Sequence, residues 1–208
     1  MCSRKIVTVC IIACLSVCAL SGQDKVLLIL KDGSENIQLM LKKEVGVVLS
    51  MLREAGYQPV VATASGATLG AWAVTLTPDL KLDQVDITDY VAVIVPCMAL
   101  GKGFGVAKAG VDLVSQAYDL MLPIAAQDGG VEFLAKAGIM KGKHFSIGSG
   151  DARIVPGGIY DGSRASVDGL IITSGTCPFL ATTTTPDTTA DLMSKLIELL
   201  QQKSADTP

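Results

Sequence analysis

The strongest constraint on the fold is an alternation of short apolar runs with segments whose apolar residues recur at helical spacing. Val26–Leu30 is a continuous apolar run, typical of a parallel strand that is buried on both faces. A predicted helix follows and ends before Gly56, where a glycine commonly closes a helix. Val60–Ala62 then predicts a second strand. The apolar face of the helix comprises Ile37, Met40, Leu41, Val45, Val48, Leu49 and Leu52.

The same alternation continues to the end of the chain. Val91–Val95 predicts a third strand, and residues 63–90 before it are less regular, with room for a short hairpin. The later predicted elements are a helix from Val111 to Tyr118, a strand Pro123–Ala126, a short helix Val131–Ala137, a strand Leu170–Thr173 and a terminal helix Asp187–Gln202. This order predicts a single-domain α/β fold, a doubly wound parallel sheet sandwiched by helices, of the flavodoxin-like kind.

The composition excludes some functions. Half of the 208 residues are apolar and only 18% are charged, so the chain has the material for a real core. The net charge of −3 comes without a basic stripe, and nucleic acid is not an expected partner. His144 is the sole histidine and lies in a predicted surface turn. No histidine-based catalysis or metal site is therefore expected, and no metal or cofactor is predicted.

The N-terminal segment has the pattern of a secretory signal peptide. Arg4 and Lys5 precede the apolar run Ile6–Leu20, which is shorter than the roughly 20 residues of a membrane-spanning helix. We expect residues 1–21 to be the signal and 22–208 the domain, which places the protein in the periplasm or outside the cell. Two alternatives stay open, an uncleaved anchor and a lipoprotein with its lipid on Cys18, which ends a lipobox-like stretch.

In doubly wound sheets, ligands bind at the carboxyl ends of the parallel strands. The loops after Leu30, Val95 and Ala126 are therefore the places to look for a site. The glycine-rich stretch Gly101–Gly105 lacks the spacing and the Ser/Thr of a phosphate-binding loop. Trp72 is as consistent with burial under a loop as with ligand binding.

Several segments together resemble the ThiJ/PfpI (DJ-1) family. Pro123–Lys143 looks like that family's nucleophile elbow, and Val167–Ser174 is similar to its late core strand. Val26–Gln38 and Asp89–Pro96 match the first and third strands with their loops. The resemblance extends from residue 25 to residue 201. It implies the flavodoxin-like fold, a homodimer, and glyoxalase, deglycase or amidase activity that depends on an elbow cysteine.

This sequence departs from the family pattern at the positions of the residues that carry out the family's chemistry. The elbow cysteine maps to Asp128, the acidic residue of the first loop maps to Gln38, and paired glycines after the third strand map to Cys97 and Met98. Because a carboxylate is a much weaker nucleophile than a thiolate, the cysteine-dependent activities are not expected. By resemblance, the pocket would contain Glu35, Gln38, Cys97, Met98, Asp128, Gly129 and Cys177.

Two interpretations of Asp128 follow. The Gln38 amide could donate a hydrogen bond to the Asp128 carboxylate beside the helix start at Gly129, or Asp128 could be only a helix N-cap. Three functional hypotheses accompany them. The chain is a non-catalytic or ligand-sensing protein, a hydrolase of a small substrate with Asp128 as nucleophile or base, or a structural, partner-binding dimer.

Two cysteines, Cys97 and Cys177, lie beyond the N-terminal segment. By resemblance, they occupy two rims of one pocket, so we expect them close together above Asp128. In an oxidising compartment they would form a disulfide, and the alternative is a pair of buried free thiols.

Overall fold

The computed structural model describes residues 22–71, 73–98, 107–148 and 152–206. The predictions for the signal segment, including Cys18, for Trp72 and for the loop Gly101–Gly105 lie outside these residues. Among the described residues, no helix is both long enough and apolar enough to cross a membrane.

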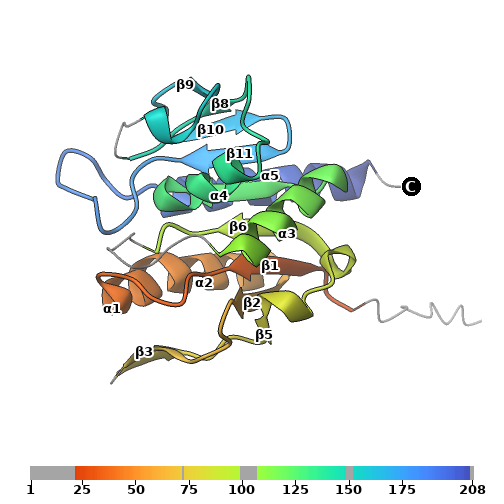
Figure 1. Ribbon diagram of the computed structural model, residues 1–208, viewed down its shortest axis with the longest axis vertical. Coiled ribbons are helices and arrows are strands. Elements are labelled where there is room, and N and C mark those ends of the chain that lie inside the picture. The colour runs from red at the N-terminus through yellow and green to blue at the C-terminus, as the bar shows by residue number, and fades with distance from the viewer. Residues whose placement is uncertain (1–21, 72, 99–106, 149–151, 207–208) are drawn as a thin grey trace, which may run out of the picture.

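The described residues form a seven-stranded sheet in the order β10-β11-β7-β6-β1-β2-β5 (Figure 1). Every neighbouring pair is parallel except β10 with β11. The strands are β1 (Lys25–Ile29), β2 (Gln58–Thr63), β5 (Leu80–Lys81), β6 (Tyr90–Val95), β7 (Ile124–Gln127), β10 (Ala165–Asp168) and β11 (Ile171–Ser174). The prediction of a single-domain α/β fold with a mostly parallel sheet is confirmed.

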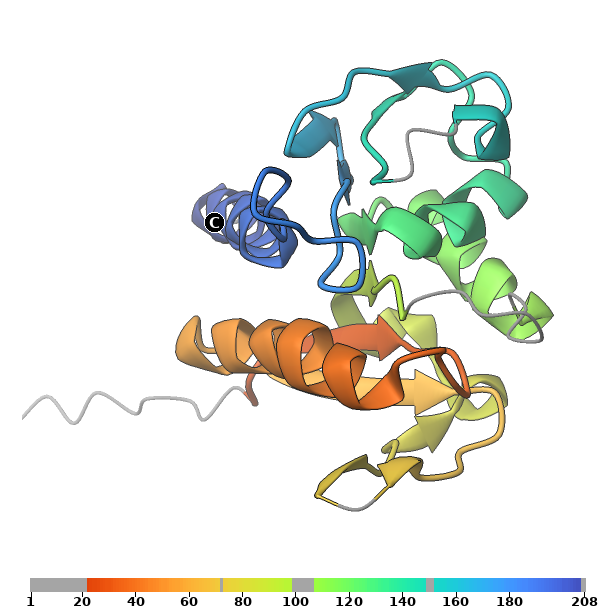
Figure 2. The ribbon, with the colours of Figure 1, turned by 90° about the vertical axis from the view of Figure 1, so that its left-hand side faces the viewer.

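Helices cover both faces of the sheet (Figure 2). One face packs against α2 (Gly46–Glu54) and α5 (Thr189–Ala205), the other against α3 (Lys108–Asp119) and α4 (Val131–Lys136). Alternation along β1 explains the two cores, because Leu28 faces the first pair of helices and Leu27 the second. Before α2, the chain forms α1 (Ile37–Met40) and a π-helical turn, η1 (Leu41–Val45).

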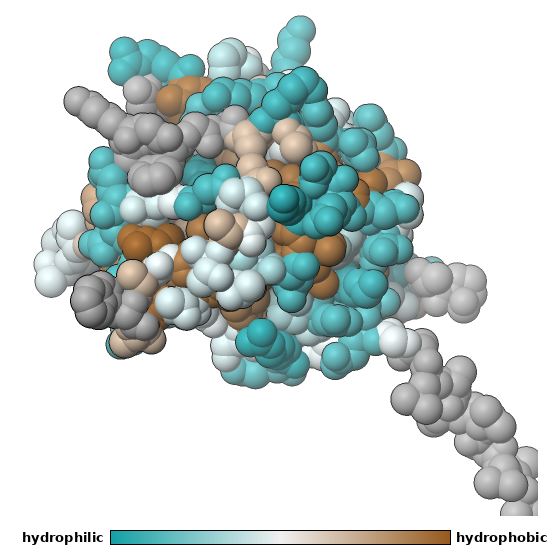
Figure 3. Space-filling view, turned by 60° about the horizontal axis from the view of Figure 1, so that its bottom comes forward, coloured by the Kyte–Doolittle hydropathy of each residue, from teal (hydrophilic) through white to brown (hydrophobic). Residues whose placement is uncertain are grey.

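Smaller elements complete the described chain. The expected hairpin within residues 63–90 is formed by β3 (Leu69–Ala71) and β4 (Val74–Leu76), whereas the edge strand β5 was not anticipated. The others are β8 (His144–Phe145), β9 (Ile159–Tyr160) and the 3-10 turns η2 (Leu82–Gln84), η3 (Ile87–Asp89), η4 (Asp128–Gly130) and η5 (Ala152–Ile154). On the face seen in Figure 3, hydrophobic residues form separate areas bordered by hydrophilic ones.

Candidate functional site

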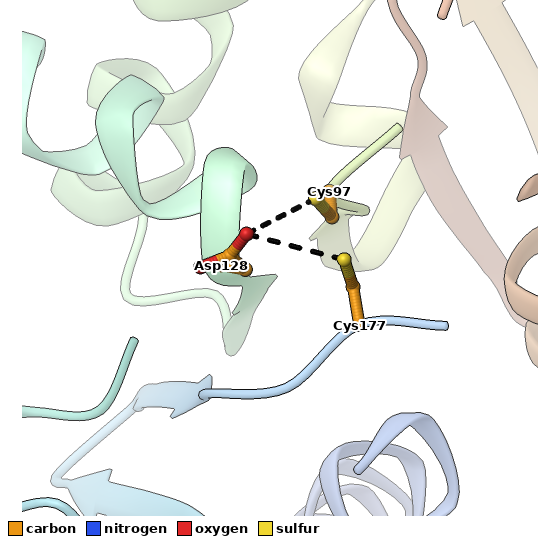
Figure 4. A group of neighbouring side chains, drawn as sticks. All are labelled: Cys97, Asp128 and Cys177. Carbon is orange, nitrogen blue, oxygen red and sulfur yellow. Dashed lines mark hydrogen bonds between the residues drawn. The ribbon is translucent and has the colours of Figure 1, made fainter. Parts of the chain in front are cut away.

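The strand register brings three loops to one edge of the sheet. Ala126 on β7 pairs with Val95 on β6 and with Thr173 on β11. Parallel strands end at the same edge, so the residues just past these three positions converge there. They include Cys97, Asp128 and Cys177, which come from the three loops in turn (Figure 4).

Asp128 occupies a sharp turn between β7 and α4. Its φ is 41°, in the left-handed region that few residues other than glycine adopt. The turn packs directly on the end of β6. A Cβ on Gly130 would lie 2.0 Å from the carbonyl oxygen of Val95, so only glycine fits there. The backbone therefore fixes the position of the Asp128 side chain.

Among the described residues, three groups donate hydrogen bonds to the Asp128 carboxylate. The Cys97 thiol lies 3.3 Å from Oδ2, the Cys177 thiol lies 3.9 Å from Oδ2, and the Gly148 backbone nitrogen lies 2.9 Å from Oδ1. Figure 4 shows both sulfur atoms directed at the same oxygen. The structure thus brings together the three residues that the resemblance placed around one pocket.

Both cysteines are buried free thiols. Cys97 is 1% exposed and Cys177 is fully buried, while Asp128 is half-buried. Their donor atoms and the Asp128 carboxylate oxygen all lie within 4.8 Å of one another. The disulfide suggested for this pair is not formed in the structure. The pKa of the Cys97 thiol is raised by its hydrogen bond with Cys177, by burial and by the nearby Glu44.

A fully buried carboxyl, Glu44, lies behind the loop that carries Cys97. Its Oε1 accepts a hydrogen bond from the Cys97 backbone nitrogen at 2.7 Å, and its Oε2 accepts one from the Met98 nitrogen at 3.0 Å. Met98 has a left-handed φ of 49°, part of the tight turn that aims both N–H groups at Glu44. Burial raises the pKa of Glu44 to about 8, against the opposing effects of these N–H groups and of Lys31.

Lys31 is the second ionisable group behind the site. It is only 4% exposed, and its Nζ donates to the Cys97 carbonyl oxygen at 2.8 Å. The same Nζ lies 5.9 Å from the centre of the Phe133 ring, within the range of a cation–π contact. Burial lowers the Lys31 pKa, while Cys97, Glu44, Glu132 and Asp128 favour the charged form.

The predicted hydrogen bond between Gln38 and Asp128 is wrong. The Gln38 amide nitrogen donates to the carbonyl oxygens of Ala71, at 2.7 Å, and Val74, at 3.2 Å, and so binds the β3–β4 hairpin. The alternative N-cap interpretation of Asp128 also fails, because α4 has Gly130 as its N-cap. The remaining predicted residues are divided. Met98 and Gly129 are buried next to the cluster in sequence, whereas Glu35 is exposed; His144, which was expected at the surface, is exposed as well.

Sequence reasoning missed both Glu44 and Lys31. Glu44 lies three residues after Leu41 and four before Val48, so it falls on the apolar face of its helix. A lone acidic residue on an apolar face was the available signal. Lys31 directly follows the predicted strand Val26–Leu30, and its buried side chain contacts the Cys97 carbonyl oxygen and the Phe133 ring.

A polar cavity of about 310 Å³ lies beside the cluster. Gly148, whose nitrogen holds Asp128, is part of its wall, together with Arg164 and hydroxyl side chains such as Ser146 and Ser163. Arg164 is paired with Asp191 at 2.5 Å. A molecule bound in this cavity would contact the residue that fixes the Asp128 carboxylate.

Comparisons with known proteins identify the family to which this sequence is similar. The sequence matches the DJ-1/PfpI family over residues 24–199. An uncharacterized protein of Archaeoglobus fulgidus is 28% identical over 153 residues, which cover 72% of this chain and 88% of that protein. A deglycase of Thermococcus kodakarensis is 26% identical over 120 residues, 57% of this chain and 69% of that protein.

Solved structures show the same fold. A ThiJ/PfpI domain protein from Brachyspira murdochii superposes with a TM-score of 0.69 at 18% identity and covers 87% of this chain and 99% of its own. DJ-1beta of Drosophila melanogaster gives a TM-score of 0.64 at 23% identity, with 88% of this chain and 98% of its own covered.

Proposed function

Because the chain belongs to the DJ-1/PfpI family, we propose that it is a non-catalytic, ligand-sensing member that works outside the cytoplasm, with Asp128 in place of the nucleophilic cysteine. One observation carries this proposal. The residue at the strained elbow is an aspartate whose carboxylate accepts hydrogen bonds from Cys97, Cys177 and Gly148. Because these hydrogen bonds engage the lone pairs of the carboxylate oxygens, the carboxylate is a poorer nucleophile still.

Neither thiol is a ready substitute nucleophile. Thiol chemistry requires a thiolate, which forms at exposed, positively biased positions. Cys97 and Cys177 are both buried, and the Cys97 pKa is raised. Each thiol also donates its S–H group to the Asp128 carboxylate.

The anion-stabilising amides of the loop are also engaged. The family's paired glycines after the third strand map to Cys97 and Met98, and the resemblance implies that the backbone of this loop would bind an oxyanion. In this chain, the N–H groups of Cys97 and Met98 donate to Glu44. Acyl-transfer chemistry requires N–H donors that are aligned with the developing oxyanion. Because both N–H groups already bind Glu44, they are not free to bind an oxyanion above Asp128.

The hydrolase hypothesis has less support for the same reasons. An aspartate nucleophile or base needs an oxygen directed at the substrate, whereas both Asp128 oxygens accept hydrogen bonds within the fold. Sensing fits better, because the polar cavity shares Gly148 with the Asp128 site. A small polar molecule in the cavity would alter the hydrogen bond that holds the carboxylate.

The test is an activity comparison on the full chain. Methylglyoxal consumption and hydrolysis of a small activated ester should both equal the buffer control. The Asp128→Asn variant should behave in the same way. Ester turnover that the parent shows and Asp128→Asn lacks would establish the hydrolase instead.

An Asp128→Cys variant separates two causes of inactivity. It returns a thiol to the elbow but leaves the Cys97 and Met98 amides bound to Glu44. We expect it to remain inactive towards methylglyoxal. Strong activity in Asp128→Cys would show that only the nucleophile is missing and that these amides do not limit the chemistry.

A further inference from the structure

We propose that Cys97, Asp128 and Cys177 form a binding site for a thiophilic d¹⁰ cation, with Zn²⁺ as the ion that fits this donor set. The three donors come from three different loops, yet they meet at one point of the sheet edge (Figure 4). This proposal goes beyond ligand sensing in the polar cavity, because it concerns the cluster itself and uses donors that the sequence did not suggest as metal ligands.

The spacing of the donors matches tetrahedral coordination. With Zn–S near 2.3 Å and Zn–O near 2.0 Å, a tetrahedral site places sulfur and oxygen about 3.5 Å apart and two sulfurs about 3.8 Å apart. The two sulfur–oxygen distances here are 3.3 and 3.9 Å, and all three donor atoms lie within 4.8 Å of one another. The two sulfur–oxygen distances therefore differ from the tetrahedral value by only a few tenths of an ångström.

The charge of the surroundings fits a divalent ion. Two thiolates and one carboxylate would carry three negative charges at a largely buried position. A divalent cation and the buried Lys31 ammonium, which binds the Cys97 carbonyl, together balance them. The Lys31 side chain thus acts as a nearby counter-charge that is not itself a ligand.

The donor types favour Zn²⁺ over the hard cations. Thiolates select soft or borderline ions, whereas Mg²⁺ and Ca²⁺ prefer sites made of oxygen. Cysteine sulfur and aspartate oxygen are both ligand types that Zn²⁺ accepts, so two sulfurs and one carboxylate can supply three positions of a tetrahedral site. Asp128 is only half-buried, which leaves an approach to the fourth coordination position for water or a ligand.

Binding would exchange protons for the ion. Each thiol gives up its S–H proton to solvent as its sulfur binds Zn²⁺, and the Asp128 carboxylate exchanges two weak S–H donors for a metal bond. No electrons move, so no oxidant or reductant is needed.

The experiment uses the full-length chain with Cys2, Cys10, Cys14 and Cys18 each replaced by serine, so that only Cys97 and Cys177 carry thiols. The reduced protein is dialysed against Zn²⁺ and its metal content is measured. We expect a single Zn²⁺ ion per chain that excess Mg²⁺ does not displace. Substitution with Co²⁺ should give thiolate-to-cobalt charge-transfer absorption and the visible bands of a tetrahedral site.

Three variants test the ligands. Cys97→Ser, Cys177→Ser and Asp128→Asn should each weaken Zn²⁺ binding by more than about 100-fold, beyond the loss that outer-shell changes cause. Asp112→Asn, at an exposed salt bridge on α3, is the matched control and should bind like the parent. Zn²⁺ should also raise the melting temperature of the parent and of the control but not of the three variants.

Several outcomes would overturn the proposal. They are a parent that binds no Zn²⁺, ligand variants that bind as tightly as the parent, and a Co²⁺ complex without thiolate absorption. A Cys97–Cys177 disulfide that persists in the protein purified without reductant would also overturn it, because the site would then lack its thiolates. A variant that fails to fold is replaced by the matching alanine variant, with metal content again the measured quantity.

Discussion

The carboxyl group of Glu44 lies 2.7 Å from the backbone nitrogen of Cys97 and 3.0 Å from that of Met98, in a fully buried position. This clamp determines the shape of the loop after β6, and so the position of the Cys97 thiol above Asp128. Buried N–H groups are costly without a partner, so the conformation of this loop depends on the Glu44 side chain, together with Lys31, which binds the Cys97 carbonyl.

Replacing Glu44 by leucine should therefore destabilise the protein. Two buried N–H groups would lose their acceptor, and the expected cost is about 2–5 kcal/mol of unfolding free energy. Glu44→Gln keeps one acceptor oxygen and should cost less. Urea unfolding at neutral pH measures both values.

The control for this prediction is Glu54→Leu on the same helix. Glu54 is exposed and bonds only Ser50 among the described contacts, so its loss should cost less than about 0.5 kcal/mol. If Glu44→Leu unfolded at the same urea concentration as the parent, the clamp would have no energetic role.

The fold was predictable because its strands are short apolar runs and its helices carry a regular apolar face. Asp128 lies in the sharp turn between β7 and α4, where the order and spacing of the surrounding residues had indicated an elbow. The acidic residue that lies behind the site was not predictable in the same way. The acidic residue of the family's first loop maps to Gln38, whereas in the structure the helical segment continues through the π-helical turn Leu41–Val45 and buries Glu44 instead.

The edge of the sheet shows a different limit of sequence reasoning. The edge strand Leu80–Lys81 pairs with β2 through Ala62 and Thr63. A strand of this length is too short to be recognised as an apolar run in the sequence. Lys31 is another case, since its burial depends on Phe133 and on the Cys97 carbonyl, which approach from distant parts of the chain. Such positions are decided by tertiary packing.

The pKa of Asp168 gives a pH-dependent prediction. Its carboxylate accepts hydrogen bonds from the His144 backbone nitrogen, at 2.9 Å, and from Lys143 Nζ, at 3.0 Å, and these two groups lower its pKa. A folded-state pKa below the unfolded one contributes stability above the unfolded pKa, and that stability is lost as the pH falls through the folded pKa.

Asp168→Asn should therefore be less stable than the parent at pH 7, by about 1–2 kcal/mol, the usual value of charged hydrogen bonds. The difference should shrink as the pH falls below about 4, where the parent carboxylate takes up its proton. Asp83→Asn, at an exposed position on η2, serves as the control. A difference between Asp168→Asn and the parent that stayed constant from pH 7 to pH 3 would rule out this electrostatic origin.

The N-terminal pattern predicts export, and the described structure does not reach that segment. In the native host, we expect the protein outside the cytoplasm with a mature N-terminus at Gly22, or at a lipid-bearing Cys18. N-terminal sequencing and mass spectrometry distinguish the two, and Cys18→Ser should change only the second. Cytosolic material with Met1 still in place would contradict export.

The left-handed backbone at Asp128 leads to the last prediction. A φ of 41° costs an ordinary residue about 1–2 kcal/mol, and glycine avoids that cost. Asp128→Gly and Asp128→Ala both remove the carboxylate and its three hydrogen bonds, so they differ mainly in backbone strain. Asp128→Gly should therefore be more stable than Asp128→Ala by about 1 kcal/mol, although the greater freedom of glycine in the unfolded chain reduces the difference.

Urea unfolding of the two variants provides the comparison, with Glu132→Gly against Glu132→Ala as the control. Glu132 is on α4, where the order should reverse in favour of alanine. An alanine variant at least as stable as the glycine variant at position 128 would show that the elbow relaxes once its carboxylate is gone, and that the strain is imposed by the Asp128 contacts and not by the turn.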